Sequence, residues 1–256
     1  MPYTTLQALI FDVDGTLAET EDLHRRSFNE TFRQHGLDWD WNEVLYSKLL
    51  QTTGGRERIA RYVSDYVPHQ RDVLDNLAVL HNAKTKNYLS LLRDGDLALR
   101  PGVVRLVHEA RLCGLKLAIA TTSNPHNVKA LLRGGLGDES PNWFTIAAGD
   151  VAPKKKPSPD VYYQALEAMD VGPGNAVAFE DSSNGLQAAL AAGLAVVATP
   201  SRFLADENLD GALSVVSDLG EPEKPLRHIA GAAFSKGYVD VEGLKAVFAA
   251  ARRGRG

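Results

Sequence analysis

The sequence predicts an α/β fold, in which a doubly wound, Rossmann-like parallel sheet forms the core and an all-helical cap domain is inserted into it. Two observations support this fold. Short apolar runs rich in Val, Ile, Ala and Leu alternate with helical patterns along most of the chain, as in βαβ units whose strands are buried on both faces. About a hundred residues between the first two runs contain helical patterns only.

Six apolar runs are the predicted strands, and polar or acidic residues follow them. They span residues 6–11, 115–120, 144–148, 176–179, 195–198 and 213–216. The predicted helices between the later strands span residues 103–112, 125–132, 160–169 and 186–192. The Pro- and Gly-rich stretch 221–240 predicts irregular structure.

Helical spacing of apolar side chains recurs three times between the first two strands. The three patterns start near Leu23, Ile59 and Val73. The third continues to Leu91 and is expected to end near Gly95. These patterns predict the helices of the cap.

We expect residues 19–97 to form the cap domain, and residues 1–18 with 98–256 to form the core. The predicted hinges are the segment after Leu17 and the Arg100-Pro101-Gly102 turn. Proline fixes φ in such a turn, and glycine permits an unusual backbone conformation.

Composition excludes several classes of function. The 256 residues carry 28 Lys+Arg against 32 Asp+Glu, and the absence of an extended basic stretch argues against nucleic-acid binding. No apolar run approaches the roughly 18 residues of a membrane helix. The single cysteine, Cys113, cannot form an internal disulfide, and no Cys/His cluster suggests zinc. We expect a cytoplasmic monomer that binds neither membrane nor nucleic acid.

The first predicted strand ends in two carboxylates, Asp12 and Asp14, followed by Gly15. Ligands of open α/β sheets bind at the carboxyl ends of the strands. A calcium loop or a simple turn is the alternative interpretation of Asp-x-Asp-Gly. A calcium loop would continue with alternating oxygen ligands, whereas Thr16 and Leu17 follow here.

Three further motifs follow later strands. The hydroxyls of Thr121, Thr122 and Ser123 precede a helix start and predict an anion site, with a plain helix cap as the alternative. Lys156 precedes a Pro-x-Pro segment that can hold it rigidly, although charge runs are usually solvated. Glu180-Asp181 follows the fourth strand, where a surface turn is the alternative.

The four motifs occur in order on one predicted sheet edge. Asp12, Asp181 and a backbone carbonyl are hard oxygen ligands of the kind that suits Mg²⁺. A cation and hydroxyls around a carboxylate predict phosphoryl transfer to that carboxylate.

This ordered set resembles the haloacid dehalogenase superfamily with a helical cap, and the resemblance covers nearly the whole chain. An aspartate at the position of Asp14 is the pattern of its phosphatases and mutases. The resemblance implies Asp12 as nucleophile, Asp14 as general acid/base, Thr121 and Lys156 as the phosphate-binding pair, and Asp12, the Asp14 carbonyl, Glu180 and Asp181 as Mg²⁺ ligands.

Residues 18–29, 53–58 and 81–86 resemble the CbbY family more narrowly, with Arg56 in place of a lysine. This resemblance implies a phosphatase of a sugar bisphosphate, namely xylulose 1,5-bisphosphate, a misfire product that inhibits Rubisco. The candidate substrate-binding residues are Glu21, His24, Gly54, Gly55, Arg56, Arg58, His81, Lys84, Thr122, Ser123 and Asn127.

The main alternative is a β-phosphoglucomutase-like enzyme, which shares the cap, a histidine at the position of His24 and an arginine at that of Arg56. A non-enzymatic phosphoacceptor, such as a signalling receiver, would be about half this length. A sugar-phosphate sensor would not need both Asp12 and Asp14.

A bisphosphate needs a second phosphate site, which the cap must supply. We expect Arg56 to form it together with Lys84 and His81, which share a face of a predicted helix. We also expect Asp14 to gain its proton in a desolvated site on cap closure, because free aspartic acid has a pKa near 4.

Overall fold

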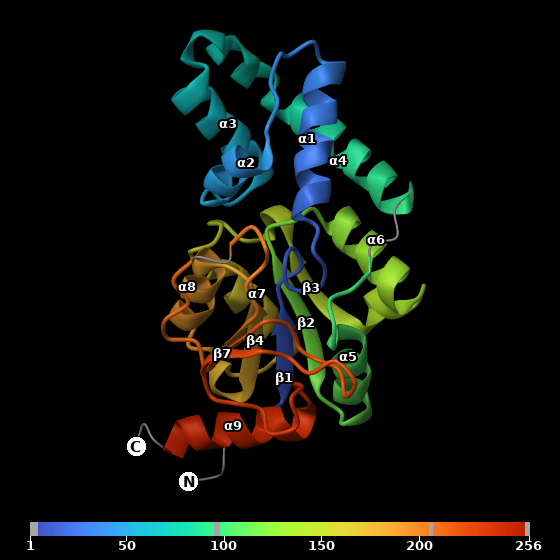
Figure 1. Ribbon diagram of the computed structural model, residues 1–256, viewed down its shortest axis with the longest axis vertical. Helices are drawn as coiled ribbons and strands as arrows, with labels where there is room; N and C mark the ends of the chain where they lie inside the picture. Colours follow the sequence, from blue (N-terminus) through green and yellow to red (C-terminus); the bar gives the residue numbers. More distant parts are fainter. Residues whose placement is uncertain (1–4, 95–97, 205–206, 254–256) are drawn as a thin grey trace.

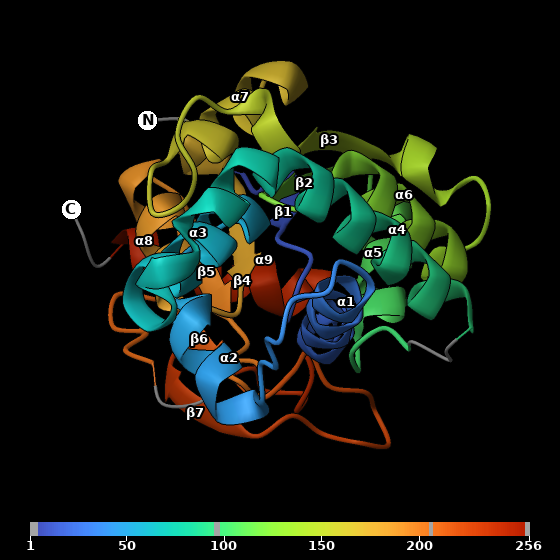
Figure 2. The same ribbon diagram turned by 90° about the horizontal axis from the view of Figure 1, so that it is seen from above.

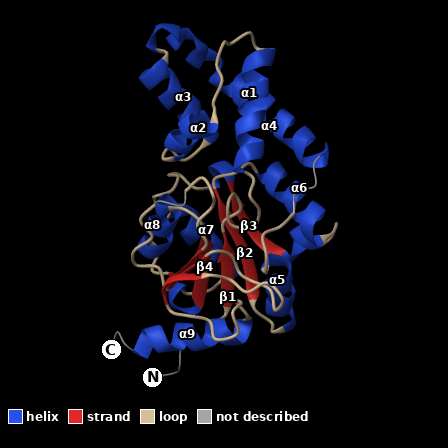
Figure 3. Ribbon diagram, viewed as in Figure 1, coloured by secondary structure: helices blue, strands red, loops and turns tan. Residues whose placement is uncertain are grey.

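The computed structural model describes residues 5–94, 98–204 and 207–253. One sheet forms its centre, with strand order β3-β2-β1-β4-β5-β6-β7 (Figure 3). The first six strands pair in parallel, and β7 is antiparallel to β6. The strands are β1 (Ala8–Phe11), β2 (Lys116–Thr121), β3 (Phe144–Ala148), β4 (Ala176–Glu180), β5 (Ala195–Ala198), β6 (Ser214–Val216) and β7 (His228–Gly231).

Helices cover both faces of the sheet, and single-turn 3₁₀ helices lie at Ser140–Trp143, Gly149–Val151 and Pro173–Asn175. Successive strand residues point to opposite faces. Leu9 and Phe11 therefore join one apolar cluster, and Ala8 and Ile10 the other. The helices of the first face are α5 (Val103–Leu112), α6 (Pro125–Leu136) and α9 (Val241–Arg253), and those of the second are α7 (Asp160–Met169) and α8 (Ser183–Ala191).

The six predicted strands and the four predicted core helices are confirmed within a few residues. The expectation of irregular structure throughout 221–240 is wrong in part, because β7 lies there and pairs with β6. All four residues of β7 are exposed, so no apolar pattern indicates this strand. The following helix, α9, had no counterpart among the predicted elements.

The cap consists of α1 (Glu21–Gln34), α2 (Glu43–Leu50), α3 (Gly55–Tyr66) and α4 (Leu77–Asp94), with a 3₁₀ helix at Pro68–Asn76. These helices lie over the end of the sheet toward which the parallel strands run (Figures 1 and 2). They enclose an aromatic cluster that includes Phe28, Trp41 and Tyr46. The sequence did not indicate α2. The third predicted helix starts at Leu77, and its predicted end near Gly95 lies outside the described residues.

Two segments connect the cap to the core, and they run side by side. Ala18 forms an antiparallel bridge with Leu99, and the Arg100 amide donates to the Leu17 carbonyl at 2.8 Å. Gly102 adopts φ 83°, a left-handed conformation that favours glycine. Both predicted hinges thus lie at one place, while the domain boundaries at 18/19 and 97/98 stay a prediction.

None of the helices in the described ranges is both long and apolar enough to cross a membrane.

Candidate active site

The carboxyl ends of three strands meet at the centre of the sheet. β1 lies between β2 and β4 in the sheet. The strands after β1 are placed first on one side of it and then, from β4 onward, on the other. This switch in strand order opens a crevice beyond the strand ends. Asp12 follows β1, Thr121 ends β2, and Glu180 and Asp181 end and follow β4.

Asp12, Glu180 and Asp181 form a buried acidic cluster. Their ligand oxygens all lie within 4.8 Å of one another. Glu180 Oε2 and Asp181 Oδ2 are buried without a hydrogen-bond partner among the described residues. Burial raises the pKa of Asp181 well above its ordinary value, and the charges of Asp12 and Glu180 raise it further. An all-oxygen set with unsatisfied acceptors fits Mg²⁺.

The positively charged side chain of Lys156 binds two carboxylates of this cluster. Its Nζ donates to Asp12 Oδ1 and to Glu180 Oε1, both at 2.6 Å. Tyr162, which the sequence did not single out, donates its hydroxyl to Glu180 as well. Burial lowers the pKa of Lys156, but its two carboxylate partners raise it above its ordinary value, so the lysine is charged.

Asp12 has too little positive charge around it to be fully ionised at neutral pH. Burial raises its pKa to about 7; Lys156 opposes this rise, and the charges of Glu180 and Asp14 add to it. A cation held by the cluster would favour the ionised form of Asp12.

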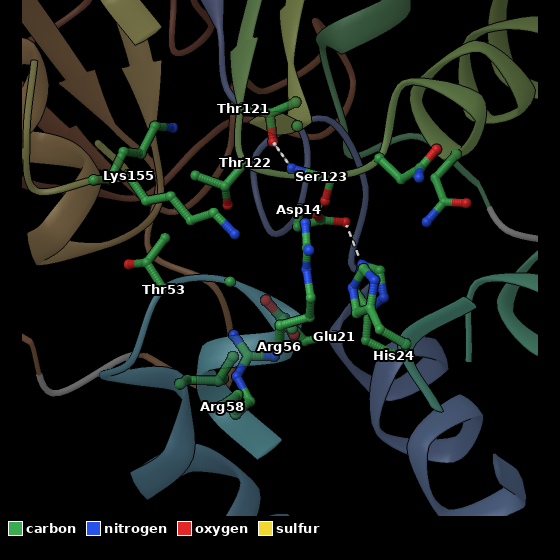
Figure 4. A pocket seen from close by; sticks show the side chains of 18 of the residues that line it. Asp14, Glu21, His24, Thr53, Arg56, Arg58, Thr121, Thr122, Ser123 and Lys155 are labelled. Atoms are coloured by element: carbon green, nitrogen blue, oxygen red, sulfur yellow. Dashed lines mark hydrogen bonds and ion pairs between the residues drawn. The ribbon is translucent and has the colours of Figure 1, made fainter. Parts of the chain in front are cut away.

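Asp14 is surrounded by hydrogen-bond donors instead. Its Oδ1 accepts from Thr20 Oγ1 at 2.5 Å, and its Oδ2 accepts from Ser123 Oγ. Oδ1 also accepts from His24 Nε2 at 2.9 Å, a contact drawn as a dashed line in Figure 4. Burial raises the pKa of Asp14, but the charge and hydrogen bond of His24, with the bonds from Ser123 and Thr20, hold it below its usual range. Three donors thus stabilise the Asp14 carboxylate in this arrangement, and the proton expected on Asp14 at cap closure stays a prediction.

His24 connects Asp14 to the cap. Its Nδ1 lies 2.5 Å from Lys84 Nζ, and its ring stacks on Tyr88 with centroids 4.3 Å apart. Burial lowers the pKa of Lys84 to about 7; Asp14 opposes this, and Arg58 adds to it. The Lys84 amino group therefore contacts His24, whereas the sequence led us to expect it in a phosphate clamp.

A cavity of about 380 Å³ lies between the core and the cap. Every site residue predicted from the sequence lines it except Glu180, which lies behind Lys156. Figure 4 shows Glu21, Arg56 and Arg58 of the cap facing Asp14 and the hydroxyl segment of the core. The core side of the cavity thus carries the acidic motifs, and the cap side carries arginines and a carboxylate.

Backbone conformation and close packing favour glycine at positions 54 and 55, which line this cavity. Gly54 adopts φ 99°, and a Cβ on Gly55 would lie 2.7 Å from His81 Nε2. Burial lowers the pKa of His81 to about 4, and the charges of Lys84 and Arg56 lower it further. His81 is therefore neutral at physiological pH.

Contacts across the cavity join cap and core, and the sequence did not indicate them. Lys155 Nζ pairs with Glu57 Oε1 at 2.8 Å, so Lys155 is not simply a solvated member of a charge run. Asn184 at the start of α8 donates to the Gln51 carbonyl at 3.0 Å. These partners are far apart in sequence, and no local pattern predicts such pairs.

Comparisons with known proteins agree with this architecture. A family model for haloacid dehalogenase-like hydrolases matches residues 6–193. Protein CbbY of Cereibacter sphaeroides is 47% identical over 219 residues, covering 84% of this chain and 94% of that protein. The plasmid-encoded Protein CbbY of Cupriavidus necator is 44% identical over 246 residues, covering 94% and 96%.

A solved structure is also similar. A crystal structure of a CbbY variant from Rhodobacter sphaeroides, in complex with xylulose-(1,5)bisphosphate, has a TM-score of 0.79 and 45% identity. The match covers 85% of this chain and 96% of that one.

The sheet, the helical cap and the matched family model define a haloacid dehalogenase-like hydrolase. Within that class the chain belongs to the CbbY family, whose members match it over most of its length. The protein is accordingly a phosphatase.

Proposed function

We propose that the protein is a Mg²⁺-dependent phosphatase that hydrolyses a small sugar bisphosphate, xylulose 1,5-bisphosphate, through an aspartyl-phosphate intermediate. The observation that carries this proposal is the buried cluster of Asp12, Glu180 and Asp181 beside Lys156, directly below a cavity whose cap side carries Arg56 and Arg58. Asp12, Glu180 and Asp181 would hold the metal, which supplies positive charge to a transferring phosphoryl group when bound.

In the proposed first step, an Asp12 carboxylate oxygen attacks phosphorus and the bond from phosphorus to the sugar oxygen breaks. Lys156, Thr121 and nearby backbone N–H groups bind the phosphoryl oxygens. The departing sugar oxygen takes a proton from Asp14. Because the free site holds Asp14 as a carboxylate, this proton must be acquired once the anionic substrate is bound.

In the proposed second step, water attacks phosphorus of the aspartyl-phosphate, and Asp14 removes its proton as general base. The hydrogen bonds from His24, Thr20 and Ser123 hold the Asp14 carboxylate in place for this step. Inorganic phosphate leaves, and the Asp12 carboxylate is restored.

The bisphosphate class follows from the composition of the cavity. Core residues account for one phosphate, and the cap adds the guanidinium groups of Arg56 and Arg58. Xylulose 1,5-bisphosphate is the ligand of the similar CbbY variant structure. A cavity of about 380 Å³ suits a small sugar phosphate.

The test is phosphate release from a panel of sugar mono- and bisphosphates. We expect xylulose 1,5-bisphosphate to give the highest kcat/KM with Mg²⁺, and EDTA to abolish turnover. Ca²⁺ should suppress it, since Ca²⁺ prefers more ligands at longer distances. Full activity after exhaustive chelation would contradict the metal assignment.

The same assay separates a phosphatase from a mutase. A mutase must return the phosphate to a sugar, whereas a phosphatase admits water after the sugar leaves. We expect inorganic phosphate as the main product. Dominant conversion of β-glucose 1-phosphate, primed with its bisphosphate, to glucose 6-phosphate would favour the mutase instead.

A further inference from the structure

One buried phenol joins two of the charged groups of the cap that line the substrate cavity. The Tyr46 hydroxyl donates to Glu21 Oε2 at 2.7 Å and accepts from Arg58 Nη1 at 2.8 Å. Glu21 belongs to α1, Tyr46 to α2 and Arg58 to α3, so this hydroxyl connects three cap helices. Glu21 and Arg58 line the cavity, but Tyr46 does not.

Packing leaves the phenol little freedom to move. Tyr46 is fully buried, and its ring contacts Trp41 and Phe28 of the cap, with centroids 6.2 and 6.4 Å away. Phe203 of the core packs edge-on against it at 6.0 Å. The hydroxyl position is therefore determined by the aromatic cluster, independently of any substrate.

The direction of both hydrogen bonds is also determined. A guanidinium can only donate, so the phenol oxygen accepts from Arg58 and must direct its own hydrogen to Glu21. Burial raises the pKa of Tyr46 well above its ordinary value, so the hydroxyl keeps its hydrogen at any working pH. Arg58 Nε has no hydrogen-bond partner among the described residues, which leaves this group unsatisfied next to the cavity.

We propose that Tyr46 is a positioning residue for substrate recognition: it separates Glu21 from Arg58 and aims both at the sugar bisphosphate. Without the hydroxyl, the carboxylate and the guanidinium would neutralise each other directly, and neither would present its remaining groups to a ligand. Held apart, Glu21 can accept from sugar hydroxyls and Arg58 can donate to an anionic oxygen. This proposal deepens the proposed function and rests on it.

The test is Tyr46→Phe, which keeps the ring and removes the hydroxyl. We expect KM for xylulose 1,5-bisphosphate to rise about tenfold, the factor that one buried hydrogen bond is worth, with kcat changed less than threefold. Turnover of p-nitrophenyl phosphate should stay within about twofold, since a small aryl phosphate does not need the sugar-binding groups. The ratio of kcat/KM values for the two substrates is the decisive quantity, because the fraction of folded enzyme cancels in it.

Tyr62→Phe is the matched control. Tyr62 lies in the same aromatic cluster, with its ring 5.4 Å from that of Trp41, and it does not line the cavity. We expect no change in the substrate ratio for this variant. In a Glu21→Gln background, Tyr46→Phe should lose most of its effect, because the positioned carboxylate is already gone.

An unchanged substrate ratio in Tyr46→Phe would overturn the proposal, and so would an equal change in Tyr62→Phe. Failure of the proposed function has a different signature, namely wild-type enzyme that releases no phosphate from xylulose 1,5-bisphosphate. In that case the ratio is measured with the best sugar phosphate of the panel, and the same tenfold change is expected.

Discussion

Asp12 and Asp14 are separated by one residue and have opposite electrostatic surroundings. Asp12 shares its site with two further carboxylates, and its pKa is raised to about 7. Asp14 accepts three hydrogen bonds, and its pKa is lowered. In many active sites, two neighbouring carboxyl groups with different pKa values have different catalytic roles. The proposed roles therefore need two changes on loading: a bound cation that favours the ionised form of Asp12, and a proton that Asp14 gains with the substrate.

The first prediction at this scale concerns Asp12. Asp12→Asn keeps the shape of the side chain but removes the nucleophilic oxygen charge, so we expect turnover to fall by on the order of 10³-fold or more while the fold is kept. Phosphate release and the thermal unfolding midpoint are measured together. Asp138→Asn, at an exposed carboxylate, is the control and should have no effect. Activity within tenfold of wild type would refute the assignment.

The second prediction concerns Arg56, which lines the cap side of the cavity. Arg56→Ala should lower kcat/KM for a sugar bisphosphate by roughly 10²-fold, about 2.7 kcal/mol, because remote binding energy contributes to catalysis. Turnover of an aryl monophosphate should barely change. Arg71→Ala, at an exposed arginine of the cap, is the control. Equal losses on both substrates would show that Arg56 has a structural role.

At the scale of elements, α9 packs against the core although it carries none of the phosphoryl-transfer motifs. Leu244 and Phe248 of this helix are buried in the first apolar cluster. Asp240 begins the helix: its Oδ1 accepts from the Gly243 amide at 2.7 Å, and its Oδ2 accepts from Lys236 at 2.7 Å. The helix start is thus determined by one capping carboxylate.

Asp240→Ala should therefore destabilise the protein by about 1 kcal/mol, the usual value of a helix N-cap. Burial raises the pKa of Asp240, but its bonds to Lys236 and Gly243 hold it below the ordinary value. This contribution to stability is present above pH 4 or so and is lost as the pH falls through the lowered pKa. Urea unfolding at pH 7 measures the change.

Glu242→Ala is the control, because that side chain is 81% exposed. We expect little change in unfolding for it, and wild-type kcat for both folded variants. A loss of catalytic rate in folded Asp240→Ala would mean that α9 acts on the active site.

At the scale of the whole molecule, the cap and the core enclose the cavity together. Their contacts across it include the Lys155–Glu57 ion pair, with side chains 21% and 44% exposed. A pair of this exposure contributes at most about 1 kcal/mol. This ion pair therefore adds little to the free energy of separating cap and core.

Lys155→Glu should raise KM for the bisphosphate by up to about fivefold, and the swap Lys155→Glu with Glu57→Lys should restore most of the loss. Added salt should reduce the difference in KM between wild type and Lys155→Glu, because the charges of a partly exposed pair are screened. Steady-state kinetics at two KCl concentrations measure both. If the swapped pair stays as impaired as the single variant, Lys155 acts on the substrate and not on Glu57.

Much of the fold and of the core site could be predicted from the sequence by itself. Apolar runs buried on both faces mark the parallel strands, and the motifs at Asp12, Thr121, Lys156 and Glu180-Asp181 follow strand ends or precede a helix. Parallel strands bring their carboxyl ends to one edge, so local patterns and chain order are enough to gather these residues. The resemblance to the CbbY family rests on further local segments, residues 18–29, 53–58 and 81–86.

The tertiary structure alone decided which partner each of these side chains has. The packing of α1 against α4 directs Lys84 to His24, and the aromatic cluster places Tyr46 between Glu21 and Arg58. Strand β7 depends on backbone pairing at the sheet edge, with no buried face to mark it. Such contacts join residues far apart in the chain, and their geometry follows from how whole elements pack, which no local spacing encodes.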